Sequence, residues 1–273
     1  MKSRVALAAA LFALTAVSHA QQTATTQKPF EPTVGQPGKD VVWVPTSPAL
    51  VEKMLDLAKV TSSDYVIDLG SGDGRNVIAA AKRGARGMGV EWNEDMVELS
   101  RRLAKEAGVA DKATFLQGDM YDADISKATV MALFLLPTNL DKLKDKFLAL
   151  KPGSRLVLNT FTPTGWEADV TERLEEGCET WCTALLYIVP AQVAGTWQSE
   201  GGEMTLTQEF QKLSGTVSFA GAATPITEGR MRGEAITFTA GSATYTGKVS
   251  GTQMSGTMRG ADNSMRTWTA TKK

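Results

Sequence analysis

Apolar residues between about positions 46 and 160 alternate between helical spacing and short continuous runs. After Thr46 or Ser47, either of which can cap a helix, apolar residues recur at helical spacing as far as Ala58. The predicted strands are Asp64–Leu69, Arg86–Glu91, Ala113–Gln117, Ala128–Leu136 and Arg155–Thr160, and the predicted helices between them are Asn76–Arg83, Asp95–Ala107 and Leu140–Leu150. This alternation predicts an α/β fold, a Rossmann-like, mostly parallel sheet with helices on both faces.

The pattern changes after the fifth predicted strand. Two runs, Val170–Leu174 and Trp181–Val189, predict a β-hairpin that closes the sheet. From about Val193 the chain is rich in Gly and Thr and has no helical period. Short alternating runs recur there at Met204–Leu206, Leu213–Phe219, Ala235–Phe238, Thr244–Val249, Gln253–Met258 and Met265–Trp268. We therefore expect a second domain over residues 192–273, a small antiparallel barrel or meander of about eight strands.

The first twenty residues have the layout of a secretory signal peptide. Two basic residues precede an apolar run from Val5 to Val17, and small residues end at Ala20. Because the run is short for a membrane span, cleavage after Ala20 is favoured over an uncleaved membrane anchor. Residues 21–40 are polar, with three prolines and two glycines, and are expected to form a flexible leader. The pattern predicts an exported protein, periplasmic or secreted, whose α/β domain covers residues 41–191.

Composition narrows the function classes. The 273 residues carry a formal net charge of -1 at pH 7, which gives no bulk electrostatic reason to expect nucleic acid as a partner. The one histidine, His19, lies in the predicted signal peptide, so the mature chain lacks the base of Ser-His-Asp catalysis and the commonest zinc ligand. No metal site is expected. Cys178 and Cys182 form either one disulfide or two free buried thiols, and the sequence leaves both possibilities open.

The segment from Val66 to Arg75, VIDLGSGDGR, carries the strongest chemical signal. A strand runs into a glycine turn and then a helix, so backbone N–H groups can approach a ligand closely. The dinucleotide fingerprint G-x-G-x-x-G places its third glycine at position 75, where this sequence has Arg75. This difference argues against an NAD-dependent oxidoreductase. A carboxylate beside the turn suits a cationic amino group, and S-adenosylmethionine has such a group and no phosphates. The residues expected to hold the cofactor here are Asp68, Gly70, Ser71, Gly72 and Asp73.

Two further acids follow the next two predicted strands. Glu91 ends the second strand, where a carboxylate can accept both ribose hydroxyls of a nucleoside. Asp119 follows the third strand and can accept from an adenine amino group, with Met120 covering the face of the ring. Singly, each acid also has a structural interpretation: Asp68 or Asp73 as a helix cap, Glu91 as a surface charge and Asp119 as a turn residue. Together, and in this order, they predict a nucleoside site at the carboxyl ends of the strands.

With these residues, the sequence resembles the class I S-adenosylmethionine-dependent methyltransferases over about residues 40–190. Val44–Thr46 before the first helix and Phe134–Pro137 after the fourth strand are similar to one group of these enzymes. That group includes the mitochondrial lysine methyltransferases that act on the c-ring protein of ATP synthase. The second domain resembles, by its general pattern alone, the small lipocalin-like β modules of secreted proteins.

The resemblance implies S-adenosylmethionine as methyl donor and a lysine ε-amino group as acceptor. It also implies that Thr46 lines the methionine end of the cofactor, and that Leu135, Leu136 and Pro137 border the methyl-transfer channel. Methyl transfer from a sulfonium is an in-line displacement, so the protein mainly aligns the acceptor and excludes water. Asp73 and Asn159 are the candidate acceptor-side groups, and the sequence identifies no general base.

Three functions remain open at this point. The first is an exported S-adenosylmethionine-dependent methyltransferase acting on protein lysine. The second is a non-catalytic exported module that binds S-adenosylmethionine or a nucleoside, and the third is a methyltransferase for small molecules. The expected partner is therefore a protein or small-molecule methyl acceptor, and the sequence does not predict the oligomeric state.

Overall fold

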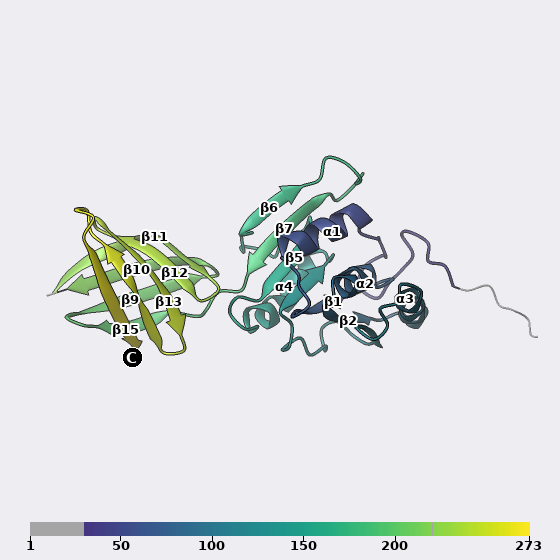
Figure 1. The fold of residues 1–273 in the computed structure, drawn as a ribbon, viewed down its shortest axis with the longest axis horizontal. Coiled ribbons are helices and arrows are strands. Elements are labelled where there is room, and N and C mark those ends of the chain that lie inside the picture. Colours follow the sequence, from purple (N-terminus) through teal and green to yellow (C-terminus); the bar gives the residue numbers. More distant parts are fainter. Residues whose placement is uncertain (1–29, 220) are drawn as a thin grey trace, which may run out of the picture. The chain divides into compact units, whose positions relative to one another are not determined.

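The computed structural model describes residues 30–219 and 221–273. The predicted signal peptide and the first part of the predicted leader lie outside the described residues. The described chain forms a seven-stranded sheet with helices, followed by a closed barrel (Figure 1). None of the helices in this described part is long and apolar enough to cross a membrane.

The seven-stranded sheet has the order β3-β2-β1-β4-β5-β7-β6. Strands β1 to β5 run parallel, and β7 is antiparallel to both of its neighbours. The bounds are β1 (Tyr65–Leu69), β2 (Arg86–Glu91), β3 (Ala113–Gln117), β4 (Val130–Leu133), β5 (Arg155–Asn159), β6 (Val170–Arg173) and β7 (Thr183–Ile188). The strand order reverses between β1 and β4, where open α/β sheets bind ligands beyond the carboxyl ends of the strands. The predicted mostly parallel, Rossmann-like sheet is confirmed.

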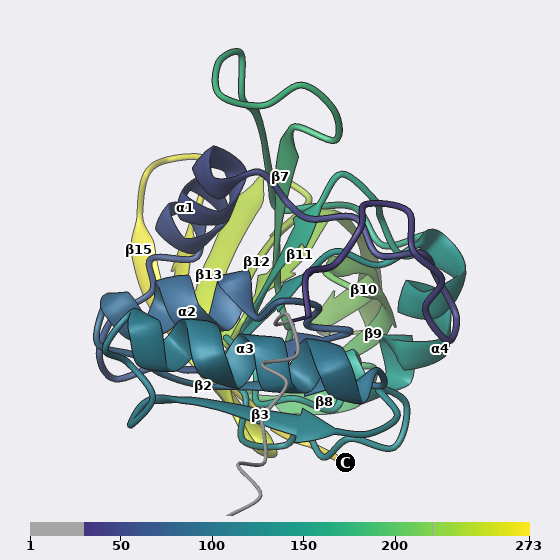
Figure 2. The same cartoon turned by 90° about the vertical axis from the view of Figure 1, so that its right-hand side faces the viewer.

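Helices cover both faces of this sheet, as predicted. They are α1 (Pro48–Leu57), α2 (Arg75–Lys82), α3 (Glu94–Glu106) and α4 (Pro137–Leu148). Successive residues of a strand point to opposite faces, so Val66 of β1 packs with α1 while Ile67 and Leu69 pack with α4. Figure 2 shows α1, α2 and α3 as one group, with α4 apart from them.

Strand β4 is shorter than its apolar run. The run from Ala128 to Leu136 predicts one strand, but pairing ends at Leu133 and Pro137 begins α4. Proline suits the first turn of a helix because that turn's N–H groups have no partner within the helix. The apolar residues Phe134–Leu136 therefore leave the sheet as a loop at its carboxyl edge.

The hairpin β6–β7 has the predicted antiparallel pairing and settles the question of the cysteines. Cys178 and Cys182 form a disulfide in the connection between the two strands, with their Cα atoms 5.7 Å apart. Strand β7 begins at Thr183 rather than at Trp181, because Trp181 has a left-handed backbone with φ of 53°. Trp181 thus belongs to the disulfide-closed loop.

The predicted second domain is a closed antiparallel barrel of eight strands. Its strands are β8 (Gly195–Ser199), β9 (Gly202–Glu209), β10 (Lys212–Phe219), β11 (Ala222–Arg232), β12 (Ala235–Ala240), β13 (Ala243–Ser250), β14 (Gln253–Arg259) and β15 (Met265–Lys272). Pairing of β15 with β8 closes the barrel, so no strand edge is left open. The interior is filled by one apolar cluster that includes Trp197, Phe238 and Trp268.

A buried carboxylate ties together the amino ends of three neighbouring strands of the sheet. Asp64 accepts from the backbone N–H of Thr61 at 2.8 Å and from the Thr129 hydroxyl at 2.8 Å, and it pairs with Arg155. Burial alone would raise the pKa of Asp64, but the hydrogen bonds from Thr61 and Thr129 and the charge of Arg155 outweigh it and lower this pKa.

We expect Asp64→Asn to lower the free energy of unfolding by about 1–2 kcal/mol at pH 7, because these donors lose a charged acceptor. Because the pKa of Asp64 is lower in the folded state than in the unfolded state, its ionisation stabilises the fold fully at pH values above the unfolded-state pKa of about 4. This stabilisation is lost as the pH falls through the folded-state pKa. Urea titrations at a series of pH values should show the difference shrinking in acid. The exposed Asp111→Asn serves as control, and a difference that persists in acid would contradict the assignment.

Candidate functional site

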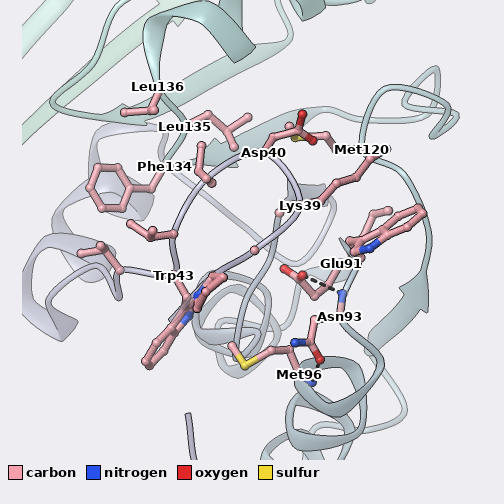
Figure 3. A pocket seen from close by; sticks show the side chains of 18 of the residues that line it. Lys39, Asp40, Trp43, Glu91, Asn93, Met96, Met120, Phe134, Leu135 and Leu136 are labelled. Carbon is pink, nitrogen blue, oxygen red and sulfur yellow. Dashed lines mark hydrogen bonds between the residues drawn. The ribbon is translucent and has the colours of Figure 1, made fainter. Parts of the chain in front are cut away.

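A cavity of about 240 Å³ opens at the carboxyl edge of the seven-stranded sheet. Its walls are formed by residues of the segments 36–44, 90–93, 118–120 and 134–136, together with Gly70, Met96, Phe161 and Trp181. Five of the predicted cofactor residues meet here: Gly70, Glu91, Asp119, Met120 and Leu135. Figure 3 shows Glu91, Asn93 and Met96 on one side of the cavity and the 134–136 loop on the other.

The glycine loop after β1 turns tightly and brings Gly70 into the cavity wall. Gly70, Gly72 and Gly74 all have positive φ, of 68°, 55° and 79°. The N–H groups of Gly70 and Ser71 donate to the carbonyl of Val90 in β2, which fixes the loop against the neighbouring strand. A Cβ added to Gly70 would make only an ordinary contact with Leu135, at 3.4 Å, so it is the left-handed backbone that favours glycine at this position.

Glu91 is held by the backbone on both of its carboxylate oxygens. One oxygen accepts from the N–H of Gly72 at 3.0 Å and the other from the N–H of Asn93 at 2.9 Å. A carboxylate has about four acceptor positions, so two remain for a ligand in the cavity. This arrangement suits the role predicted for Glu91, acceptance from a pair of ribose hydroxyls.

Asp119 lies beyond β3 and is already paired within the chain. One oxygen accepts from the N–H of Tyr121 at 2.9 Å, and the other pairs with the ammonium of Lys39. The hydrogen bond with Lys39 holds the pKa of Asp119 below its usual range and raises the pKa of Lys39. The same ammonium lies 4.4 Å from the centre of the Trp92 ring. A cation from the predicted leader therefore occupies the position expected for the adenine amino group.

Residues 36–44, here called the strap, form one wall of the cavity. Backbone hydrogen bonds between Gly35 and Trp43 and between Trp43 and Gln36 close the segment into a turn. The Trp43 indole packs on Gly72, where an added Cβ would come within 2.6 Å of it. Residues 36–40 of the predicted flexible leader are thus placed with defined contacts, because a tryptophan at the end of the segment anchors them to the glycine loop.

We expect Lys39→Ala to bind S-adenosylhomocysteine about two- to fivefold more tightly, because an adenine amino group no longer competes with an ammonium for Asp119. Calorimetry at low ionic strength measures this, and added salt should reduce the difference. Lys127→Ala, which removes an exposed lysine outside the cavity wall, is the control. Weaker binding by Lys39→Ala would show that Lys39 holds the ligand instead of competing with it.

Five predicted residues do not line the cavity: Thr46, Asp68, Ser71, Gly72 and Asp73. Asp68 is 3% exposed, and its carboxylate accepts from the Asn76 side chain at 3.0 Å. Burial raises the pKa of Asp68 well above its ordinary value, and the nearby carboxylates of Glu91 and Asp73 add to this. Asp68 is therefore positioned beneath the loop rather than at its surface.

The candidate acceptor-side groups also lie elsewhere. Asp73 accepts from the guanidinium of Arg75 at 2.9 Å, and Arg75 in turn donates to the carbonyl of Thr46. Asn159 is buried, and its amide donates to the Thr46 hydroxyl at 3.2 Å. These contacts connect the glycine loop, α1 and the end of β5. They give Asp73, Asn159 and Thr46 structural partners and leave them outside the cavity wall.

The other end of the cavity is aromatic and was not predicted. Phe134 stacks on Phe161 with ring centres 5.9 Å apart, and Trp181 lies 5.8 Å from Phe134. These rings come from three segments distant in sequence, so no local pattern brings them together. Among the described residues, no cluster of His, Cys, Asp and Glu suits a metal ion.

The α/β part of the chain has known relatives. Residues 68–170 match the ANTKMT methyltransferase domain family. A protein-lysine N-methyltransferase of Saccharolobus islandicus is 38% identical over 152 residues, which are 55% of this chain and 94% of the relative. The adenine nucleotide translocase lysine N-methyltransferase of Mus musculus is 36% identical over 129 residues, 46% of this chain and 56% of that relative. The chain thus spans about half the length of the mouse protein.

A solved structure is similar over the same share of the chain. It is described as an RNA methyltransferase from Salinibacter ruber in complex with S-adenosyl-L-homocysteine, and it is 45% identical with a TM-score of 0.51. The similarity covers 55% of this chain and 96% of the Salinibacter chain.

Proposed function

The chain belongs to the family of S-adenosylmethionine-dependent protein-lysine methyltransferases, and on this premise we propose that it methylates a lysine ε-amino group of another protein. The observation that carries this proposal is the composition of the cavity. One end has carboxylates at the ends of β2 and β3, which suit a nucleoside, and the other end is apolar and aromatic.

The residues present fit the cofactor. Gly70 contributes its backbone to the cavity wall, Glu91 retains acceptor positions for the ribose, and Met120 lies beside Asp119 in the wall for the adenine ring. S-adenosylmethionine supplies an activated methyl group when bound. The chain then has to hold the acceptor in line with that group and keep water out. The apolar residues at the opposite end, among them Leu135, favour this exclusion.

An acceptor amine must be neutral to react. A free lysine has a pKa of about 10.4, so its amine is almost entirely protonated at neutral pH. Removal from water lowers the pKa of an amine, because burial disfavours the charged form. The buried apolar side chain of Leu135 in the cavity wall contributes to such an environment.

The negative charge near the aromatic end of the cavity favours protein over RNA as the methyl acceptor. The connection from Leu174 to Cys182 carries Glu175, Glu176 and Glu179, all exposed, and no basic residue. These carboxylates repel a phosphate backbone and attract a basic protein segment. The name of the Salinibacter structure makes RNA the rival acceptor that a test must include.

We also propose that the protein acts after export. The N-terminal pattern of basic, apolar and small residues supports export, and the Cys178–Cys182 disulfide is typical of an oxidising compartment. Fractionation of the producing cells, with N-terminal sequencing of the mature chain, tests this. A chain recovered from the cytosol with residues 1–20 intact would contradict it.

Two measurements test the catalytic proposal. Calorimetric titration of the full chain with S-adenosylmethionine and S-adenosylhomocysteine should show binding of both. Transfer of a radiolabelled methyl group into protein, RNA and small-molecule fractions of an extract should then label a protein band. Label in RNA or in small molecules alone would contradict the lysine acceptor, and binding without any transfer would favour the non-catalytic module.

A further inference from the structure

The disulfide-closed loop Cys178–Cys182 brings an aromatic side chain to the cavity. Cys182 is buried just before β7, and its carbonyl accepts from the N–H of Leu174 at 2.8 Å, so one end of the loop is fixed to the sheet. The disulfide ties Cys178 back to this fixed end. Between them, Trp181 has a left-handed backbone, which is costly for a bulky side chain and persists only where its surroundings enforce it.

Trp181 lies where the cavity meets solvent. It lines the cavity and is 42% exposed, as is Leu136 on the neighbouring loop. Its ring lies against that of Phe134, which in turn stacks on Phe161, and both phenylalanines are partly buried. The three rings thus form a continuous wall, here called the aromatic wall, that runs from the opening inward. An exposed tryptophan at the opening of a pocket is the kind of residue that anchors a partner.

The chemistry of this wall fits one kind of side chain. Aromatic faces pack against an aliphatic stem and attract a cation through the ring quadrupole. A lysine has both parts, an apolar stem and a terminal ammonium. The exposed acids Glu175, Glu176 and Glu179 on the same connection add attraction for basic residues that flank such a lysine.

We propose that the disulfide-closed loop is the acceptor-recognition element of this enzyme. Trp181, held in place by the Cys178–Cys182 bridge, completes the aromatic wall that receives a lysine from a basic protein segment, and the bridge makes this recognition dependent on oxidation of the loop. The inference rests on the proposed lysine acceptor, which it makes more specific. Trp181 is a specificity residue of the acceptor site and takes no part in holding the cofactor.

The test uses the full chain, saturating S-adenosylmethionine and two synthetic peptides. Each peptide has one lysine, flanked by arginines in one and by glutamates in the other. The variants are Trp181→Ala, Trp181→Phe, the double variant Cys178→Ser/Cys182→Ser, and Met265→Ala as an exposed apolar control in the barrel. The readouts are kcat and KM for each peptide and the Kd for S-adenosylhomocysteine, with circular dichroism to show that every variant is folded.

We expect the wild type to prefer the arginine-flanked peptide. Trp181→Ala should raise the KM for this peptide about tenfold. The KM of Trp181→Phe should lie close to that of the wild type, because an aromatic ring is kept. The Kd for S-adenosylhomocysteine should be unchanged in both variants. The double serine variant should raise the KM in the same direction, and reduced wild type should behave like it. Met265→Ala should match the wild type.

The possible failures are distinguishable. If the wild type methylates the peptide and Trp181→Ala or the double serine variant does so with the same KM, the role of the loop is overturned while the lysine acceptor stands. If the wild type binds S-adenosylhomocysteine but methylates neither peptide, the proposed acceptor fails, and the inference fails with it. A preference for the glutamate-flanked peptide would overturn the part assigned to the acidic residues.

Discussion

Gly74→Ala is expected to lower the free energy of unfolding by about 2–5 kcal/mol. Gly74 has φ of 79° where the glycine loop enters α2, and a left-handed backbone costs a residue with a Cβ about 1–2 kcal/mol. The added Cβ would also lie 2.5 Å from the ring of Phe115, a buried residue of β3 that packs against α2 and α3. Overpacking of such a core costs about 1–3 kcal/mol.

A second glycine separates these two costs. Gly108 after α3 has a similar φ of 69°, but an added Cβ there meets no atom within 4 Å. Gly108→Ala should therefore lose only the backbone contribution, about 1–2 kcal/mol. Urea denaturation of both variants measures the difference, and equal losses would show that the Phe115 contact contributes nothing.

Glu91→Ala is expected to weaken S-adenosylhomocysteine binding by about 2 kcal/mol, or roughly 30-fold. The substitution removes the acceptor predicted for the ribose hydroxyls. It also releases the N–H groups of Gly72 and Asn93, which the carboxylate now holds at 3.0 and 2.9 Å. The glycine loop should then be less well ordered before the ligand arrives. Calorimetric titration of the full chain measures the effect.

Two further variants sharpen this result. Glu94→Ala removes an exposed acid three residues along the chain and should leave the affinity unchanged. Glu91→Gln keeps the size of the side chain but offers one acceptor oxygen in place of two, so its affinity should fall between those of the wild type and Glu91→Ala. An affinity equal to that of the wild type in Glu91→Ala would exclude Glu91 from the site.

The sequence predicted the sheet well because its signals are local. Strands β2 and β3 begin and end where their apolar runs do, and glycines mark the turn after β1. In the barrel, β8 and β11 were not assigned individually. Strand β11 includes Pro225, and its pairing with β12 shifts between Thr227 and Arg230, next to Glu228 with φ of 52°. Such a bulge breaks the alternation by which a strand is identified.

The carboxylates of the cavity were predictable because their signals are also local, whereas residues brought in from distant segments were not. Glu91 and Asp119 stand at ends of strands, and that position alone brings them to one edge of the sheet. Lys39 contacts Asp119 across 80 positions of the sequence. Trp181 lines the cavity from within a loop closed by a disulfide, and neither contact has a local sequence pattern. Asp73 has a partner that its position in the glycine loop did not indicate. The sequence predicts that Asp73 contacts the cofactor, and in the structure its carboxylate forms an ion pair with Arg75.

The closure of the barrel affects the order in which the chain can fold during synthesis. All strands of the seven-stranded sheet are available once Ile188 has been made. Strand β8, in contrast, obtains its second neighbour only when β15 is complete, near the end of this sequence. Until then β8 and β14 each present an unpaired edge, on which another nascent chain can add a strand. Synthesis that stalls within the barrel would thus leave a completed seven-stranded sheet joined to a partial barrel with two unpaired strand edges.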